Sequence, residues 1–254
     1  RQLEDNEDNP ATGRYALTSL SDSETIAHLA TGMKRFDLPN EFNFVQILKG
    51  IANSSDSQQA GHIIQASTTL SQLYQNRRQY PKAAEVLRSV IKRFPQVTKN
   101  YGIHKTLETI VGNWGAFDPI SGQTTNEQNV FTYKFRNADK VTFTAHRIDV
   151  PKLLADVKTH IDLNRASDVQ YTINDISNLM YHQNAARYIN EKVTDWSVDL
   201  EPREHHFDKR ITVEVPIKAT GAYKITAKVE GGNTSSIVYW LNNTTMVKMA
   251  TNNG

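Results

Sequence analysis

Two adjacent histidines, His205 and His206, belong to the stretch of sequence whose residue types come nearest to a metal site. Glu204 precedes them and Asp208 follows, and imidazole nitrogens and carboxylate oxygens are ordinary ligands of zinc. Neighbouring residues on a strand point to opposite faces, so both histidines could bind one ion only from a loop. Residues 202–206 precede an alternating segment, so we interpret them as a charged turn and predict no metal site.

No other group of residues has the spacing of a catalytic motif. No serine lies in a nucleophile elbow, and the absence of cysteine removes thiolate nucleophiles, thiolate metal sites and disulfides. Asp149 and Asp156 would lie near one face of a helix, and we interpret them as a helix cap and a solvated charge. Gly231 and Gly232 indicate a hairpin turn, because neither a Lys-Ser/Thr pair nor a helix follows them. The sequence therefore predicts no enzyme and no cofactor.

Aromatic residues suggest two kinds of binding site. Trp114, Trp196 and Trp240 could form a carbohydrate platform, which would need at least two rings exposed and coplanar on one face. Trp196 and Trp240 lie in expected strands, where a role in the core or in an interface is more common. The second candidate is a protein-binding surface of four residues, which would line a peptide groove if several helical repeats stacked: Tyr74, Arg77, Arg78 and Tyr80. In a single repeat, packing is the expected role of the two tyrosines.

The composition limits the kinds of partner. The 254 residues include 29 basic and 27 acidic ones, for a formal net charge of +2, and no long basic block is present. The sequence therefore favours neither nucleic acid nor a membrane surface as a partner. No run approaches the roughly 18 apolar residues of a membrane span. Because the chain begins at Arg1, we interpret it as a piece of a longer protein.

The spacing of apolar residues along the chain changes near Gly112, which indicates different secondary structure before and after that residue. In residues 1–112 apolar residues recur at helical spacing, which predicts helices over residues 25–36, 44–52 and 104–111. Between them the sequence predicts a helical pair, with Pro81 in the first turn of its second helix and Pro95 ending that helix. This pair resembles a tetratricopeptide unit. Six of its residues have the spacing of that repeat's hydrophobic and terminating positions: Leu70, Tyr74, Tyr80, Ala83, Leu87 and Pro95.

After Gly112 the pattern becomes one of short strands. Residues 113–128, rich in Gly, Thr, Asn and Gln, are expected to be a linker. Apolar residues then alternate in seven segments: 131–135, 141–145, 193–198, 211–215, 223–229, 237–241 and 246–249. We therefore predict an α+β chain of two domains, with an antiparallel immunoglobulin-like β-sandwich over residues 129–254. A helical insertion is expected at about 149–190, with one helix capped by Asp149 and a second beginning near Thr172.

Several short motifs of the strand-rich half resemble the amino-terminal macroglobulin-type domain of bacterial α2-macroglobulin-like proteins. They are Tyr133-Lys-Phe-Arg-Asn137, Val141-Thr-Phe-Thr-Ala-His-Arg-Ile-Asp149, Pro216-Ile-Lys-Ala-Thr-Gly-Ala-Tyr223 and Gly232-Asn-Thr-Ser-Ser-Ile-Val238. The resemblance covers roughly residues 127–250 and departs from the family pattern at His146, where an aromatic residue is usual. It implies a large periplasmic, secreted or envelope-associated protein that traps proteases, in many members with a thioester. That thioester needs a cysteine, and this chain has none. The resemblance therefore implies that this chain is a scaffold segment of such a protein.

Three functions follow as alternatives. The first is a non-catalytic scaffold fragment of an α2-macroglobulin-like protein, whose partners would be a target protease or neighbouring macroglobulin domains. The second is an adaptor in which the helical half binds a protein or peptide and the sandwich is a spacer. The third is a carbohydrate-binding sandwich.

Overall fold

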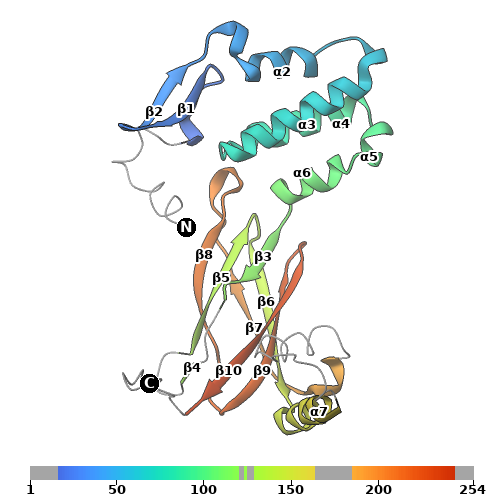
Figure 1. The fold of residues 1–254 in the computed structure, drawn as a ribbon. Helices are drawn as coiled ribbons and strands as arrows, with labels where there is room; N and C mark the ends of the chain where they lie inside the picture. The colour runs from blue at the N-terminus through green and yellow to red at the C-terminus, as the bar shows by residue number, and fades with distance from the viewer. Residues whose placement is uncertain (1–16, 120–122, 125–128, 164–184, 244–254) are drawn as a thin grey trace. The chain divides into compact units, whose positions relative to one another are not determined.

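The structure is a computed structural model that describes residues 17–119, 123–124, 129–163 and 185–243 (Figure 1). The chain divides into two compact units, one of residues 1–112 with 204–207, the other of residues 113–203 with 208–254. The first unit contains helices and one β-hairpin, and the second contains two sheets, so the fold is α+β.

The first unit begins with the 3-10 turn η2 (Leu17–Ser19) and a hairpin of β1 (Glu24–Leu29) and β2 (Gly32–Asp37). The prediction of a helix over residues 25–36 is therefore wrong. Gly32 has φ +100°, a left-handed conformation that glycine adopts cheaply and that turns the chain between the strands. Across the hairpin, Arg35 Nη2 lies 2.7 Å from Glu24 Oε2.

Helices follow the hairpin, and those expected at residues 44–52 and 104–111 are confirmed. They are α2 (Phe44–Ala52), α3 (Ala60–Asn76), α4 (Tyr80–Arg93), α5 (Val97–Asn100) and α6 (Ile103–Val111), with the 3-10 turns η3 (Asn40–Phe42) and η4 (Ser57–Gln59). Asn43 caps α2 by accepting a hydrogen bond from the Gln46 amide at 3.1 Å. Pro81 lies at the start of α4, as expected.

The helical pair α3 and α4 is present, but its membership of a tetratricopeptide array stays a prediction. The segment before α2 is a β-hairpin, not another helix pair. The buried apolar residues of α2, α3, α4 and α6 form one core: Val45, Ile63, Ile64, Leu70, Tyr74, Ala83, Ala84, Leu87, Val90, Ile103 and Ile110. This core fixes the four helices against one another.

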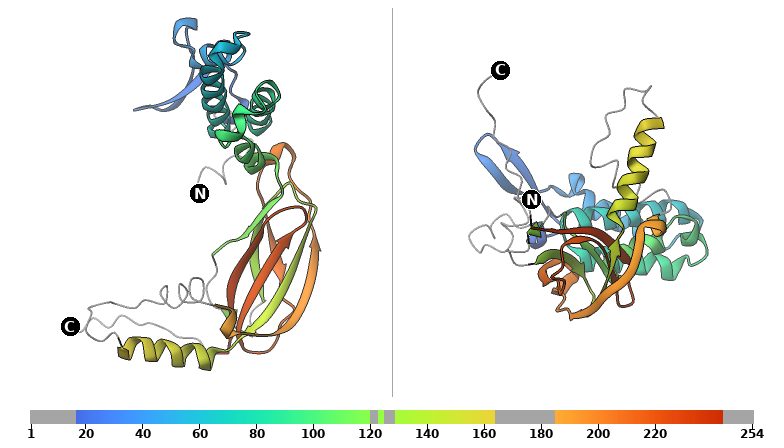
Figure 2. Two further views of the ribbon diagram at one scale, coloured as in Figure 1. Left: turned by 90° about the vertical axis from the view of Figure 1, so that its right-hand side faces the viewer. Right: turned by 90° about the horizontal axis from the view of Figure 1, so that it is seen from below.

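The second unit contains a three-stranded and a five-stranded sheet, which lie face to face (Figures 1 and 2). The first has the order β3 (Trp114–Phe117), β5 (Val130–Arg136), β8 (Lys209–Glu214). The second has the order β4 (Gln123–Thr124), β10 (Thr234–Asn242), β9 (Gly221–Val229), β6 (Lys140–Ile148), β7 (Ile189–Asp199). All pairings are antiparallel except that of β4 with β10.

Four expectations for this unit have different outcomes. The linker expected at residues 113–128 instead begins with strand β3, which pairs with β5. Helix α7 (Val150–Leu163) is confirmed, and Asp149 caps it by accepting from the Lys152 amide at 3.0 Å. The strand expected at residues 246–249 and the helix expected near Thr172 lie outside the described residues.

Aromatic rings fill the space between the two sheets. The Phe143 ring lies 5.3 Å from that of Phe131, 5.3 Å from that of Tyr133 and 5.2 Å from that of Trp196, measured between centroids. Along β9 the residues Tyr223, Ile225, Ala227 and Val229 are buried, as their alternation predicts. The inward-facing side chains of the two sheets thus pack into one core.

Strand β3 is held to the β9–β10 turn by side chains of asparagine. Asn233 accepts a hydrogen bond from the Gly115 amide and donates one to the Gly115 carbonyl, both at 2.8 Å. Asn113 donates to the Glu230 carbonyl at 2.8 Å. A Cβ at Gly232 would lie 2.4 Å from the Asn113 carbonyl oxygen, so only glycine allows this approach. This contact between residues far apart in the sequence holds β3 in the sandwich.

We predict that Asn233→Ala lowers the free energy of unfolding of the sandwich by about 1–3 kcal/mol, because both main-chain groups of Gly115 lose their partner. Urea denaturation followed by tryptophan fluorescence measures this change. Thr234→Ala, on the exposed neighbour, is the control. An equal loss in both variants would contradict the role of Asn233.

Candidate functional site

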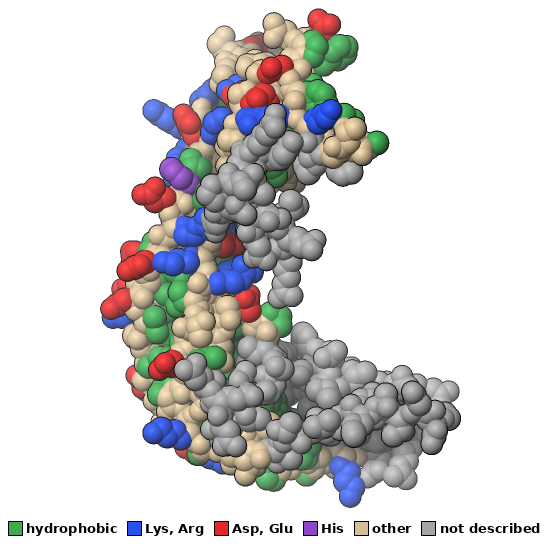
Figure 3. Space-filling model, turned by 90° about the vertical axis from the view of Figure 1, so that its left-hand side faces the viewer, with side chains coloured by type: hydrophobic (Ala, Val, Ile, Leu, Met, Phe, Trp, Pro, Cys, Tyr) green, Lys and Arg blue, Asp and Glu red, His purple; other side chains and the backbone are tan. Residues whose placement is uncertain are grey.

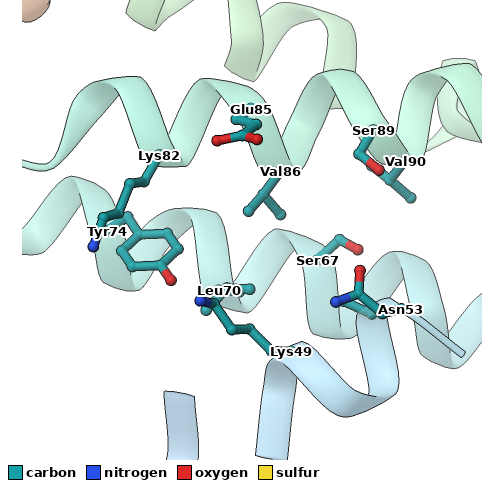
Figure 4. A pocket seen from close by; sticks show the side chains of 11 residues that line it. Lys49, Asn53, Ser67, Leu70, Tyr74, Lys82, Glu85, Val86, Ser89 and Val90 are labelled. Carbon is teal, nitrogen blue, oxygen red and sulfur yellow. The ribbon is translucent and has the colours of Figure 1, made fainter. Parts of the chain in front are cut away.

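Helices α2, α3 and α4 enclose a cavity of about 290 Å³ (Figure 4). Its walls combine apolar and polar side chains from all three helices: Lys49, Ala52, Asn53, Ser67, Leu70, Tyr74, Lys82, Glu85, Val86, Ser89 and Val90. We call this space the helical cavity. The helices fold in this way because their apolar faces meet in the common core, which leaves the polar ends of these residues around the opening.

At one end of the helical cavity, a carboxylate joins two lysines. Asp22 lies before β1, and its two carboxylate oxygens contact Lys49 Nζ and, at 3.2 Å, Lys82 Nζ. Lys82 Nζ also lies 5.4 Å from the centroid of the Tyr74 ring. The three polar groups Lys49, Asp22 and Lys82 therefore form one ion-pair network beside Tyr74.

The network shifts the pKa values of Asp22 and Lys49. Burial alone would raise the pKa of Asp22, but hydrogen bonds from Lys49 and Lys82, together with their charges, hold that pKa below its ordinary value. The hydrogen bond to Asp22 raises the pKa of Lys49. Burial raises the pKa of the Tyr74 hydroxyl. At neutral pH Lys49 is therefore held in its charged form and Tyr74 in its neutral form, which suits binding and not proton transfer.

The other end of the helical cavity carries uncharged polar groups. Asn53, which ends α2, lies there with Ser67 of α3 and Ser89 of α4 (Figure 4). Ser67 is 2% exposed, whereas Asn53 and Ser89 are exposed. Leu70, Val86 and Val90 form the apolar walls between the two ends. A ligand in this space would meet amide and hydroxyl groups at one end and apolar walls along its length.

The four residues predicted as a partner-binding surface have different surroundings in the structure. Tyr74 lines the helical cavity but is only 1% exposed. Arg77 is buried and donates to the carbonyls of Ser21 at 3.1 Å and Glu24 at 2.9 Å. Arg78 has φ +56° in the turn before α4, and the Tyr80 ring contacts that of Phe207 at 5.4 Å. Of the four, only Tyr74 belongs to the candidate site.

Sequence reasoning missed the ion-pair network. Asp22 lies far before Lys49 and Lys82 along the chain, so no local spacing joins them. The sequence offers only one signal, a carboxylate in the turn before a hairpin, and this can be read only once the hairpin is recognised.

The histidine pair lies in the 3-10 turn η6 (Glu204–His206), with φ +61° at His205 and +64° at His206. Asp208 is engaged elsewhere, at 2.9 Å from Arg136 Nε and 3.3 Å from Lys134 Nζ. Within the described part of the chain, no three His, Asp or Glu residues are grouped so that they could hold a metal ion.

The three tryptophans do not form a common platform. Trp196 stacks on Phe143 in the sandwich core, while Trp240, 42% exposed, pairs with Ala222 on the opposite face of the same sheet. Trp114 lies on the three-stranded sheet beside Lys134 and Arg136, whose cationic groups are 5.4 and 5.7 Å from its centroid. Trp196 and Trp240 therefore cannot be coplanar, as a carbohydrate platform would require.

The surface charge agrees with the near balance of the sequence. On the face drawn in Figure 3, acidic and basic side chains are interspersed. Among the described helices, none is both long enough and apolar enough to cross a membrane.

Comparison with known proteins gives distant structural neighbours only. No family model and no curated protein matches the chain. Native alpha-2-macroglobulin from Escherichia coli, spanning domains MG0-NIE-MG1, is 12% identical over 51% of this chain and 38% of that chain, with a TM-score of 0.32. A structure of its domains NIE-MG1 is 13% identical over 51% of this chain and 61% of that chain, with a TM-score of 0.27.

A third neighbour is the CARDB domain of the PF1109 protein from Pyrococcus furiosus, in complex with di-metal ions. It is 11% identical over 51% of this chain and 86% of that chain, with a TM-score of 0.25. The region matched in the E. coli MG0-NIE-MG1 structure is 38% of that chain, well under half of its length. The weak neighbours include macroglobulin domains, and at these TM-scores none of the likenesses carries an argument about activity.

We predict that Asp22 makes the first unit sensitive to acid. Because its pKa is lower in the folded state, Asp22 contributes stability above its unfolded pKa of about 3.9, and this is lost as the pH falls through the folded pKa. Asp22→Asn should lower the free energy of unfolding at pH 7 by about 1 kcal/mol, allowing for solvent screening. Urea denaturation at pH 7 and pH 3, followed by circular dichroism, checks this.

In Asp22→Asn the acid-dependent loss should be smaller than in the wild type. Glu41→Gln, at an exposed carboxylate of η3, is the matched control for the loss of one acidic group. Identical pH profiles for the wild type and Asp22→Asn would refute the proposed role of the network.

Proposed function

We propose that the chain is a non-catalytic scaffold of a larger macroglobulin-like protein. The observation that carries the proposal is that the motif residues of the β-sandwich unit are engaged in contacts that hold turns and strands. Scaffold residues are expected to be used in this way, whereas catalytic residues would converge on a cavity.

Arg147 joins two of these motifs. Its guanidinium lies 5.9 Å from the centroid of the Tyr223 ring, and its Nη2 donates to the Thr220 carbonyl at 3.3 Å. The Tyr223 hydroxyl in turn donates to the Ala219 carbonyl at 2.7 Å. Arginine and tyrosine thus hold the turn that leads into β9, where Gly221 has φ +152°.

Two further motif residues also have local structural roles. Asn137 has φ +59° between β5 and β6, a conformation that asparagine tolerates better than most residues. Asp149 caps α7. These contacts support a domain whose sequence motifs specify its turns, with any reactive chemistry supplied by other parts of the protein.

The narrower assignment is a scaffold within a protease-trapping protein outside the cytoplasm. It rests on the resemblance of the motifs, and this chain has no cysteine from which to form a thioester. Its partners would then be neighbouring domains of the same protein or a target protease.

A second candidate function is peptide binding by the helical cavity. Its volume of about 290 Å³ suits one or two side chains of an extended segment, and its rim offers the amide of Asn53 and the hydroxyl of Ser89. Such groups match the alternating donors and acceptors of a peptide main chain. In this function the β-sandwich unit would serve as a spacer.

For the scaffold function, we predict that Arg147→Ala lowers the free energy of unfolding of the sandwich by about 1–2 kcal/mol, because a cation–π contact and a hydrogen bond are lost. Urea denaturation measures this, with Lys218→Ala in the same exposed turn as the control.

We also predict that the wild-type chain leaves the rates at which a panel of endopeptidases cleave casein unchanged. Stoichiometric inhibition or casein cleavage by the chain would contradict a non-catalytic scaffold.

For the cavity, we predict that Ser89→Trp weakens the binding of peptides selected from an unstructured peptide library by about 10-fold or more, because the indole would fill the space. Isothermal titration calorimetry on the full chain measures this. Arg88→Trp is the matched control, since Arg88 is exposed on α4 and does not line the cavity. Equal affinities in the two variants would reject the cavity as the binding site.

A further inference from the structure

A pocket of about 350 Å³ lies at the end of the five-stranded sheet where β6 and β10 end and β9 begins. We call it the Trp240 pocket, and its apolar lining comes from six residues: Ile148, Val150, Pro151, Ala222, Trp240 and Leu241. Ile148 and Ala222 are 3% and 0% exposed and belong to a small core between the sheet and α7. The floor of the pocket is therefore already packed, so a ligand would not need to order it.

Trp240 gives the pocket an aromatic wall that solvent reaches. Its side chain is 42% exposed, and the residue opposite it on β9 is Ala222. Alanine is too short to cover an indole ring, so the ring lines the pocket and stays open to solvent. One exposed apolar residue is ordinary on a protein surface. Tryptophan and arginine together at a pocket are, however, the residue types that most often dominate the binding energy of protein interfaces.

Arg147 is the only charged residue among those that line the Trp240 pocket. It is exposed, and no carboxylate of the described residues forms an ion pair with it. Its Nη2 donates to the Thr220 carbonyl, which leaves the guanidinium with further N–H donors. Three other arginines of the β-sandwich unit each have a carboxylate partner: Arg136 at 2.9 Å from Asp208, Arg210 at 2.9 Å from Asp118 and Arg187 at 3.1 Å from Asp156.

The absence of a counter-ion determines the chemistry of the ligand. An apolar group that enters the pocket displaces water from the Arg147 guanidinium, and a desolvated charge is costly unless it is paired. The ligand must therefore supply an acceptor, and a carboxylate matches the planar guanidinium best. We propose that the Trp240 pocket binds a segment of another protein domain in which a large apolar side chain neighbours an acidic one. The apolar side chain lies against Trp240, and the carboxylate accepts hydrogen bonds from Arg147.

The rim of the pocket favours a side chain of a protein over a free small molecule. Arg147, Pro151 and Trp240 are all exposed, so a ligand would stay open to solvent on one side. Small-molecule sites enclose most of their ligand, whereas a side chain can be held by the rest of a protein interface. The inference rests on the scaffold function for the nature of the partner, and it gives that function one specific contact.

Selective ¹⁵N labelling of tryptophan in the full chain tests the proposal, because the 3 tryptophans give separate indole N–H signals. Trp240→Phe identifies the signal of Trp240, and Trp114 and Trp196 serve as controls in the same spectrum. Titration with the peptide acetyl-Gly-Asp-Phe-Asp-Gly-amide, to about 10 mM, should move the Trp240 signal saturably and leave the other two in place. The same peptide with Asn in place of both Asp residues should bind about 10-fold or more weakly, because the guanidinium then lacks its anion.

Arg147→Gln should remove the difference in affinity between the Asp and Asn peptides. Lys218→Gln makes the same change of charge at an exposed residue outside the pocket lining and should preserve that difference. Circular dichroism establishes that each variant is folded, and the comparison of the two peptides on the wild-type chain needs no variant.

A Trp240 signal that does not move, or that moves equally with both peptides, would overturn the proposal. Tighter binding of 3-phenylpropionate than of the Asp peptide would also overturn it, because the pocket would then be a site for a small acid. None of these results bears on the scaffold function, which the unfolding and casein measurements test separately.

Discussion

A two-stranded hairpin cannot bury an apolar face on its own, and the first unit depends on how this constraint is met. Strands β1 and β2 precede the helices and are tied to them through polar side chains. Arg77 donates to the carbonyls of Ser21 and Glu24, and Gln79 donates to that of Leu20 at 2.7 Å. Asp22 adds its ion pairs to α2 and α4. These bonds hold the hairpin to the helices and place the Asp22 carboxylate against Lys49 and Lys82, which line the helical cavity.

The β-sandwich unit meets a similar constraint through its turns. Its apolar core accounts for the pairing of the two sheets, but the position of β3 depends on Asn233, and the entry to β9 depends on Arg147 and Tyr223. Polar residues of the sequence motifs thus act as donors and acceptors for main-chain groups. This use of polar side chains explains how a chain can carry specific motifs and still be a non-catalytic scaffold.

Much of the fold could be predicted from the sequence, because the periodicity of buried residues is local. Helix α2, the α3–α4 pair and the strands β5 to β10 follow their apolar patterns. The β1–β2 hairpin was not predicted, because the spacing of Ile26, Leu29 and Met33 also fits a helix. Only Gly32, in its left-handed conformation, specifies a turn there. Strand β3 was also missed, because its place depends on Asn233, far along the chain. The candidate site was missed for the same reason, since Asp22 meets its lysines only in the folded unit.

The central claim is that polar residues singled out by the sequence hold strands and turns in place through main-chain groups. Arg77 tests it most directly, because the sequence suggested a binding role and the structure gives it a structural one. Amide hydrogen exchange of Arg77→Met, followed by mass spectrometry, should show faster exchange in residues 21–37, with the exchange of residues 114–148 unchanged. Unchanged exchange in residues 21–37 would contradict the claim, because Arg77 would then not hold the hairpin.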